Sequence, residues 1–229
     1  MQRSDRSLAK QAKDADSVVV IGLGRFGGTL AESLTKLGHE VLGIDESMKI
    51  VQDYADVLTH VAQADSTDEE ALQQLGVGDF HRAVVGIGTD IEASVLTVVA
   101  LTEVGVKEIW AKAISAKHAK ILASVGAHHV VRPEAEMGDR VAHLITGKMI
   151  DYIKFEDGFA IAKVRAPKDA VGRTLADSAL RSQYGITIVG IKRRGEDFTY
   201  AQADTVIPPE ALLVVTGTED QVQRFAAIT

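Results

Sequence analysis

Val18-Val19-Val20-Ile21-Gly22-Leu23-Gly24-Arg25-Phe26-Gly27 decides the fold of this chain, because it joins an apolar strand to a glycine turn of the form Gly-x-Gly-x-x-Gly. Helical sequence follows, and then a second apolar strand that ends at Asp45. Strand, glycine turn, helix, strand and terminal acid together form the context of a dinucleotide-binding fingerprint. The alternative is a glycine-rich turn that holds no ligand.

Each glycine of this turn has a predicted role. Gly22 permits the tight turn, Gly24 lets the backbone approach a phosphate, and Gly27 lets the helix pack closely on the strand. The free N–H groups at the helix start would face the ligand, whose negative charge the helix dipole favours. Asp45 can accept hydrogen bonds from ribose hydroxyls. Its charge would repel a 2′-phosphate, which favours a plain adenosine ligand over NADP.

The composition excludes several classes of function. The 229 residues allow one large and one small domain, and 46% hydrophobic residues suffice for a core. A net charge of −7 argues against a nucleic-acid partner, and the lack of cysteine excludes disulfides and thiolate chemistry. No apolar run approaches the roughly 20 residues that span a bilayer. We therefore expect a soluble, cytoplasmic protein whose membrane role, if it has one, comes through a partner.

Strands and helices alternate in the first part of the chain. The predicted strands are 17–22, 40–45, 59–63, 82–87, 108–111 and 128–131, and the predicted helices between them are 28–37, 48–54, 68–75, 91–103 and 116–125. This alternation predicts an α/β fold, a Rossmann-like doubly wound parallel sheet covered on both faces.

The pattern changes after Pro133. We predict a crossover helix at 134–146, strands at 152–155, 159–165, 186–191 and 212–216, and a closing helix at 219–227, which together indicate a small α+β domain. The expected organisation is an N-terminal extension, 1–16, that is frayed or forms a short surface helix, a nucleotide-binding domain, 17–147, and a C-terminal domain, 148–229.

Several polar residues are site candidates, each with a plainer alternative. Arg25 can pair with phosphate oxygens or be a solvated arginine. Asp65 can bond an adenine amino group or form an Asx turn, and Lys112 can reach a phosphate or be a surface lysine. Glu134 suits a helix start, which the residues alone favour, or could join a divalent cation beside a phosphate. Gly88, in the Gly-Ile-Gly run after the fourth strand, lets the backbone approach a ligand.

Catalytic and metal motifs are not found. The seven histidines have no pair at ligand spacing, so we interpret them as structural or surface residues. Gly-x-Ser-x-Gly and Walker A patterns are missing from the sequence. We predict no catalytic residue.

Six segments carry a likeness to a known family. They are 20–27 and 38–45, 87–94 (Ile-Gly-Thr-Asp-Ile-Glu-Ala-Ser), 109–112 (Ile-Trp-Ala-Lys), 132–138 (Arg-Pro-Glu-Ala-Glu-Met-Gly) and 184–188 (Tyr-Gly-Ile-Thr-Ile). Together they resemble the RCK (KTN) domain of cytosolic potassium-transport regulators of the KtrA/TrkA type. The resemblance covers nearly the whole chain after about residue 17.

The resemblance implies a regulatory role without enzymatic activity. It implies an octameric homo-oligomeric ring of dimers, docked at the inner face of the cell membrane on a potassium-transporting membrane subunit of the KtrB/TrkH type. ATP and ADP would compete for the N-terminal cleft, with ATP favouring the active state. Several relatives also bind cyclic di-AMP between C-terminal subdomains, for which the residues around Ile186 are candidates.

The resemblance also assigns roles to single residues. Arg25 would contact ATP phosphates, also across a dimer, while Asp45 would bind ribose and Lys112 would lie near the phosphates. Glu134 would join Mg2+ or Ca2+ beside the nucleotide. Asp65 and Ser66 would border adenine, although the family has Asn at position 65. The predicted cofactor-binding set is Gly22, Gly24, Arg25, Phe26, Gly27, Asp45, Glu46, Asp65, Ser66, Gly88 and Lys112, and the predicted metal residue is Glu134.

Two other functions satisfy the glycine fingerprint. An NAD-dependent dehydrogenase would need a substrate domain and a catalytic residue, but only a small C-terminal unit remains and no His, Lys or Tyr stands in a recognisable catalytic setting. A redox sensor would bind NAD or NADH as a regulatory ligand without chemistry.

Overall fold

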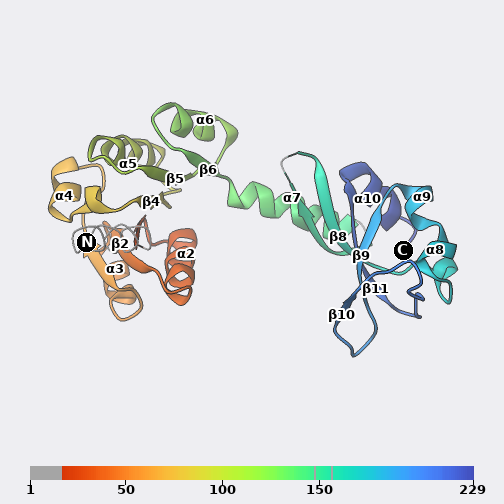
Figure 1. Ribbon diagram of the computed structural model, residues 1–229. Helices are drawn as coiled ribbons and strands as arrows, with labels where there is room; N and C mark the ends of the chain where they lie inside the picture. Colours follow the sequence, from red (N-terminus) through yellow and green to blue (C-terminus); the bar gives the residue numbers. More distant parts are fainter. Residues whose placement is uncertain (1–16, 147, 156) are drawn as a thin grey trace, which may run out of the picture. The chain divides into compact units, whose positions relative to one another are not determined.

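A computed structural model of the protein describes residues 17–146, 148–155 and 157–229. The chain forms two compact units, Met1–Glu134 and Ala135–Thr229. The predicted N-terminal extension, 1–16, lies outside the described residues. Each unit has its own sheet and its own core (Figure 1).

The first unit is built on a six-stranded parallel sheet in the order β3-β2-β1-β4-β5-β6. This order confirms the doubly wound fold, because β1 lies between β2 and β4 and the chain reverses its direction of travel there. The strands are β1 (Ser17–Ile21), β2 (Glu40–Asp45), β3 (His60–Gln63), β4 (Arg82–Val85), β5 (Glu108–Lys112) and β6 (His129–Val131).

Helices cover both faces of this sheet (Figure 1). One apolar cluster joins Ala31 of a helix to Val18 and Val20 of β1, and the other joins Leu72, Leu101 and further helical residues to the opposite face. Successive side chains of a strand point to opposite faces, so β1 contributes to both clusters. The helices are α2 (Arg25–Lys36), α3 (Met48–Tyr54), α4 (Glu69–Gln74), α5 (Ile91–Glu103) and α6 (Ala116–Ser124), with a 3-10 turn η1 (Val77–Asp79).

Two boundaries differ from the predictions in a way that affects the site. Helix α2 begins at Arg25, three residues before the predicted start at residue 28. Gly27 is therefore a residue of the helix, and it packs closely against the end of β1. Strand β4 ends at Val85, so residues 86–88 form a loop beyond the sheet. Both changes bring more backbone to the edge where the parallel strands end.

The second unit holds a five-stranded antiparallel sheet in the order β10-β9-β11-β8-β7. Its strands are β7 (Met149–Lys154), β8 (Phe159–Arg165), β9 (Thr187–Lys192), β10 (Phe198–Tyr200) and β11 (Leu212–Thr218). Its helices are η2 (Lys168–Ala170), α8 (Leu175–Ser178), α9 (Leu180–Tyr184) and α10 (Glu219–Ala226). Strand β10 and the helices α8 and α9 are additional to the predicted elements.

Helix α7 (Pro133–Thr146) begins in the first unit and belongs to the second from Ala135 onward. Arg140 pairs with Asp151 of β7 at 2.5 Å, and the ring of His143 lies 4.3 Å from that of Tyr152. Leu144 packs against the second core. The predicted boundary after residue 147 assigned this helix to the first domain.

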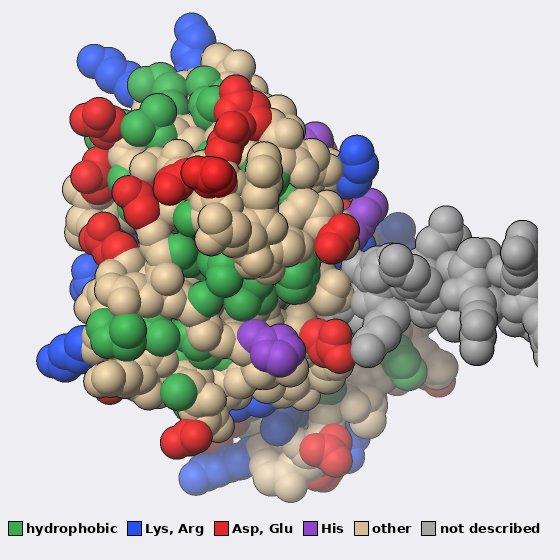
Figure 2. Space-filling model, turned by 90° about the vertical axis from the view of Figure 1, so that its left-hand side faces the viewer, with side chains coloured by type: hydrophobic (Ala, Val, Ile, Leu, Met, Phe, Trp, Pro, Cys, Tyr) green, Lys and Arg blue, Asp and Glu red, His purple; other side chains and the backbone are tan. Residues whose placement is uncertain are grey.

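The surface of the first unit carries many acidic side chains. Figure 2 shows a group of them on the side where α4 lies, and α4 itself begins with Asp68, Glu69 and Glu70. Acids in a first helical turn interact favourably with the helix dipole.

Among the helices of the described residues, none has both the length and the apolar character needed to cross a bilayer.

Candidate functional site

The glycine turn lies at the carboxyl edge of the parallel sheet, between β1 and α2. Gly22 has φ +82°, and its amide donates to the Ile44 carbonyl at 2.8 Å. A Cβ on Gly27 would collide with the Gly22 carbonyl oxygen, whereas a Cβ on Gly24 would have no described heavy atom within 4 Å. Gly27 is therefore required for packing, while Gly24 leaves open space beside the turn.

Asp45 fixes this turn. Its Oδ2 accepts a hydrogen bond from the Leu23 amide at 2.8 Å, its Oδ1 accepts one from the Ser47 amide at 2.9 Å, and the residue is only 9% exposed. The carboxylate thus joins the glycine turn to the start of α3. The predicted ribose contact must use the lone pairs that these two bonds leave. Leu23 and Ser47 were not predicted, since nothing in the sequence marks a backbone amide as a partner.

Asp45→Asn is expected to lower the free energy of unfolding of the first unit by about 1–3 kcal/mol, because an amide can accept through only one oxygen and its NH2 then faces a buried N–H. Urea denaturation followed by far-UV circular dichroism measures the change. Asp65→Asn is the control, since Asp65 is itself exposed and we expect a smaller effect. Equal effects of the two substitutions would contradict a special role for Asp45.

The start of α2 offers free donors to an anion. Gly24 is its N-cap, no side chain of the described residues caps it, and its first turn holds no acidic residue. By contrast, Asp68, Asp90 and Ser115 cap α4, α5 and α6. The first N–H groups of a helix have no partner within the helix, so those of α2 can bind an anion. Arg25, the first helical residue, is exposed beside them.

Lys112 lies at this edge of the sheet, next to residues from three other segments of the chain. Its side chain is only 11% exposed, and its Nζ lies 2.6 Å from Glu134 Oε1 and 5.6 Å from the centre of the Phe26 ring. A Cβ on Gly88 would lie 3.3 Å from the same Nζ. The structure thus brings together Phe26, Gly88, Lys112 and Glu134 from four separate segments. Lys112 is a largely buried cation and not the surface lysine of the alternative interpretation.

The hydrogen bond from Lys112 holds the pKa of the Glu134 carboxyl below its ordinary value of 4.5, and the charge of Arg25 acts in the same direction. Because the folded pKa is depressed, the ion pair contributes stability above the ordinary pKa and loses it as the pH falls through the folded value. Glu134 is 66% exposed, so solvent screens this contribution.

Lys112→Met is expected to raise the titration midpoint of Glu134 toward 4.5, because the ammonium that favours the charged carboxylate is gone. Carbon-detected NMR of the Glu134 side-chain carboxyl measures the midpoint. The titration of Glu108, whose pKa Arg82 lowers elsewhere in the sheet, serves as the reference that should not move. An unchanged Glu134 midpoint would show that the pair does not form in solution.

The remaining candidates lie at the ends of β2 and β3. Asp65 Oδ1 accepts from the amide and the hydroxyl of Thr67, which lowers the pKa of Asp65 and forms the Asx turn of the alternative interpretation. The buried Ser66 hydroxyl shares a hydrogen bond of 2.8 Å with Thr97 of α5. Glu46 is exposed, and its carbonyl accepts from Gln63 Nε2. These side chains border the edge, but no contact links them to Lys112.

A divalent cation would find few protein ligands at Glu134. The part of the chain that the structure describes contains no group of three or more His, Cys, Asp or Glu side chains that could hold a metal. Lys112 already takes one oxygen of Glu134. The residues therefore fit a cation only if phosphate oxygens of a bound ligand supply most of its coordination.

Comparison with known proteins gives matches over both units. Residues 18–133 match the TrkA-N domain family and residues 159–229 match the TrkA-C domain family. Ktr system potassium uptake protein C of Bacillus subtilis (strain 168) is 39% identical over 207 residues, which are 90% of this chain and 94% of that protein. Ktr system potassium uptake protein A of the same organism is 35% identical, over 90% of this chain and 93% of that protein.

Solved structures with the same fold include two of GsuK. The crystal structure of the GsuK RCK domain has a TM-score of 0.65 at 20% identity and covers 93% of this chain. The GsuK channel bound to NAD has the same TM-score, identity and coverage of this chain. This chain spans 47% and 39% of the two GsuK chains, respectively. At this identity the likeness shows the fold.

Proposed function

Because the chain belongs to the family of proteins with a TrkA-N and a TrkA-C domain, we propose that it is a nucleotide-binding regulatory subunit of a potassium uptake system. The names of its relatives, Ktr system potassium uptake proteins C and A, support the transport role. The enclosed Lys112 beside the uncapped start of α2 is the observation that carries nucleotide binding, since together they suit a polyphosphate.

In this proposal the ligand is ATP or ADP, and ATP favours the active state. Arg25 and Lys112 take phosphate charge, the Asp45 lone pairs face ribose, and Asp65 and Ser66 border adenine. The phosphates compete with Glu134 for Lys112. The freed Glu134 carboxylate can then help to hold Mg2+ or Ca2+ against the phosphate oxygens. ATP can shift the protein between states only if it binds one of them more tightly.

Arg25→Ala is expected to weaken ATP binding by about tenfold and ADP binding by less than about threefold, because we assign the guanidinium to the terminal phosphate. Isothermal titration of the purified protein with each nucleotide measures both. Lys36→Ala, at the other end of α2, is the control variant that should change neither. An equal loss for ATP and ADP would contradict the assignment to the terminal phosphate.

The assembly and location follow the same proposal. Dimers would form an octameric ring on the cytoplasmic side of the membrane and bind a potassium-transporting subunit of the KtrB/TrkH type. Helix α7 would be the hinge through which the nucleotide acts. Cyclic di-AMP would be a second ligand of the C-terminal domain. Sedimentation of the purified protein with and without ATP tests the ring, and a species no larger than a dimer under all conditions would oppose it.

A second candidate is a sensor of NAD or NADH, which the NAD-bound GsuK channel favours as a protein of the same fold. Titration with ATP, ADP, NAD, NADH and cyclic di-AMP, with and without Mg2+ or Ca2+, separates the two candidates. Tight binding of ATP that a divalent ion enhances supports the first candidate. Binding confined to NAD or NADH supports the second, and turnover of NADH on a panel of 2-hydroxy acids and aldehydes would indicate a dehydrogenase instead.

A further inference from the structure

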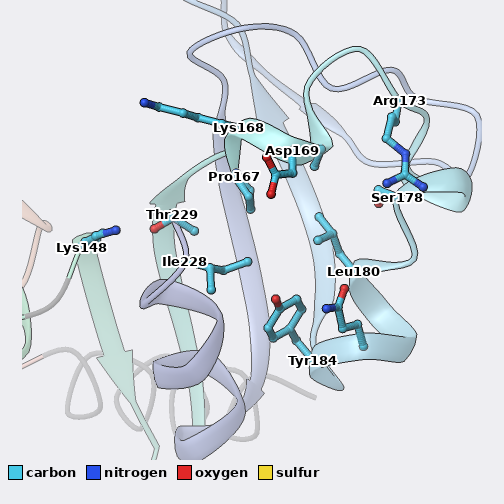
Figure 3. A pocket seen from close by; sticks show the side chains of 12 residues that line it. Lys148, Pro167, Lys168, Asp169, Arg173, Ser178, Leu180, Tyr184, Ile228 and Thr229 are labelled. Atoms are coloured by element: carbon cyan, nitrogen blue, oxygen red, sulfur yellow. The ribbon is translucent and has the colours of Figure 1, made fainter.

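The second unit contains a cavity of about 480 Å³ that is separate from the nucleotide site (Figure 3). All of its lining residues lie between 148 and 229, whereas the nucleotide-site residues lie in the first unit. Its walls come from the residue before β7, from η2, from α8 and α9, and from the segment after α10. Small-molecule sites have volumes of about 300–1,000 Å³, so the cavity has room for a metabolite-sized ligand.

The cavity combines an apolar wall with a net positive rim. Leu180, which is 5% exposed, lies beside Tyr184 and Ile228 on the apolar side. The charged side chains of the lining are those of Lys148, Lys168, Arg173 and Asp169, three cations and one carboxylate. Among the described residues no ion pair within 4.0 Å includes Lys148 or Lys168. Two lysines without an anionic partner beside an apolar wall suit an anion with an apolar body.

The backbone next to the cavity has an unusual conformation. Ala179 has φ +54°, a left-handed conformation that is uncommon for a residue with a side chain. It separates α8 from α9, and its two neighbours, Ser178 and Leu180, both line the cavity (Figure 3). Arg173 is held at the rim by a hydrogen bond from its guanidinium to the Asp177 carbonyl. Strained backbone of this kind clusters at ligand sites.

We propose that this cavity is a second ligand site, which takes a small phosphate monoester or carboxylate with an apolar body. Lys148 and Lys168 receive the negative charge, and Leu180 and Tyr184 pack against the apolar part. Asp169, which lies between Lys168 and Arg173 in Figure 3, repels a negative charge placed next to it and can accept a hydrogen bond from a ligand hydroxyl.

The probe for this site is phenyl phosphate, and saturation-transfer NMR on the full chain measures its binding. We expect a dissociation constant about tenfold higher for the double variant Lys148→Gln/Lys168→Gln, and an unchanged one for the control Lys120→Gln on α6 of the first unit. Asp169→Asn should tighten binding by about threefold, because it removes a like charge. A gain of affinity cannot come from a damaged fold, so this variant separates a binding effect from unfolding.

Two further probes, each of which has only one part of phenyl phosphate, define the ligand class. Benzyl alcohol lacks the charge and inorganic phosphate lacks the apolar body, so both should bind more weakly than phenyl phosphate. Equal binding of either compound would overturn the stated class. Loss of phenyl phosphate binding in Lys112→Met, together with unchanged binding in the double lysine variant, would assign the probe to the first unit and overturn the site. Neither outcome depends on whether ATP binds the first unit.

Discussion

Gly27→Ala is expected to lower the free energy of unfolding of the first unit by about 3 kcal/mol, because the new Cβ would collide with the Gly22 carbonyl oxygen. Backbone cannot move aside as the end of a flexible side chain can. The helix and β1 must therefore separate, which disturbs the apolar clusters on which the sheet depends. Thermal and urea unfolding measure the loss, and the ligand-free protein should already show it.

Gly24→Ala is the matched variant in the same turn. Its φ of −64° suits alanine, and its Cβ would have no described heavy atom within 4 Å, so the stability should stay within about 0.5 kcal/mol of wild type. Its methyl group would occupy the space that we assign to a phosphate, so nucleotide affinity should fall. Unaltered affinity in a stable Gly24→Ala protein would place the phosphate elsewhere.

Lys112→Met is expected to raise the dissociation constant for ATP by roughly ten- to hundredfold, which corresponds to about 1.5–3 kcal/mol for a charge-assisted hydrogen bond. Methionine keeps the length and the apolar stem of the side chain and removes the charge. Isothermal titration measures the change. Lys120→Met, an exposed lysine of α6, is the control and should bind ATP as wild type does.

Substitution of Glu134, the ion-pair partner of Lys112, is expected to strengthen ATP binding, whereas Lys112→Met weakens it. Without divalent cations, Glu134→Gln should bind ATP about fivefold more tightly, because the phosphates no longer compete with a carboxylate for the ammonium. With Mg2+ present the advantage should disappear, since the cation loses a ligand. The control is Glu136→Gln, which removes a charge two residues further along α7. Equal changes in both variants would indicate a general charge effect and not competition for Lys112.

The sequence predicted the parallel sheet because its signals are local. A glycine turn, apolar strands and amphipathic helices can each be recognised within about ten residues. Right-handed connections then place helices on both faces, because the strand order reverses at β1. Strand β10 was missed for the opposite reason. All three of its residues are exposed, so it has no alternation, and its pairing with β9 is what makes it a strand.

The contacts within the site join residues that are far apart in the sequence, so no local sequence pattern predicts them. Lys112 and Glu134 are 22 positions apart, and they meet because β5 and β6 pair side by side. The engagement of Asp45 with the Leu23 amide also spans 22 positions. Helices α8 and α9 were not predicted because four and five residues are too few for a helical period, and the break between them is an alanine and not a glycine.

The two hydrogen bonds of Asp45 have a kinetic consequence. Since they hold the glycine turn and the start of α3 in one arrangement before any ligand arrives, an incoming ligand does not have to order this turn. Encounter should then be limited by diffusion and electrostatic attraction, so the association rate should depend on ionic strength more than on temperature. Differences in affinity among ligands would appear mainly as differences in residence time.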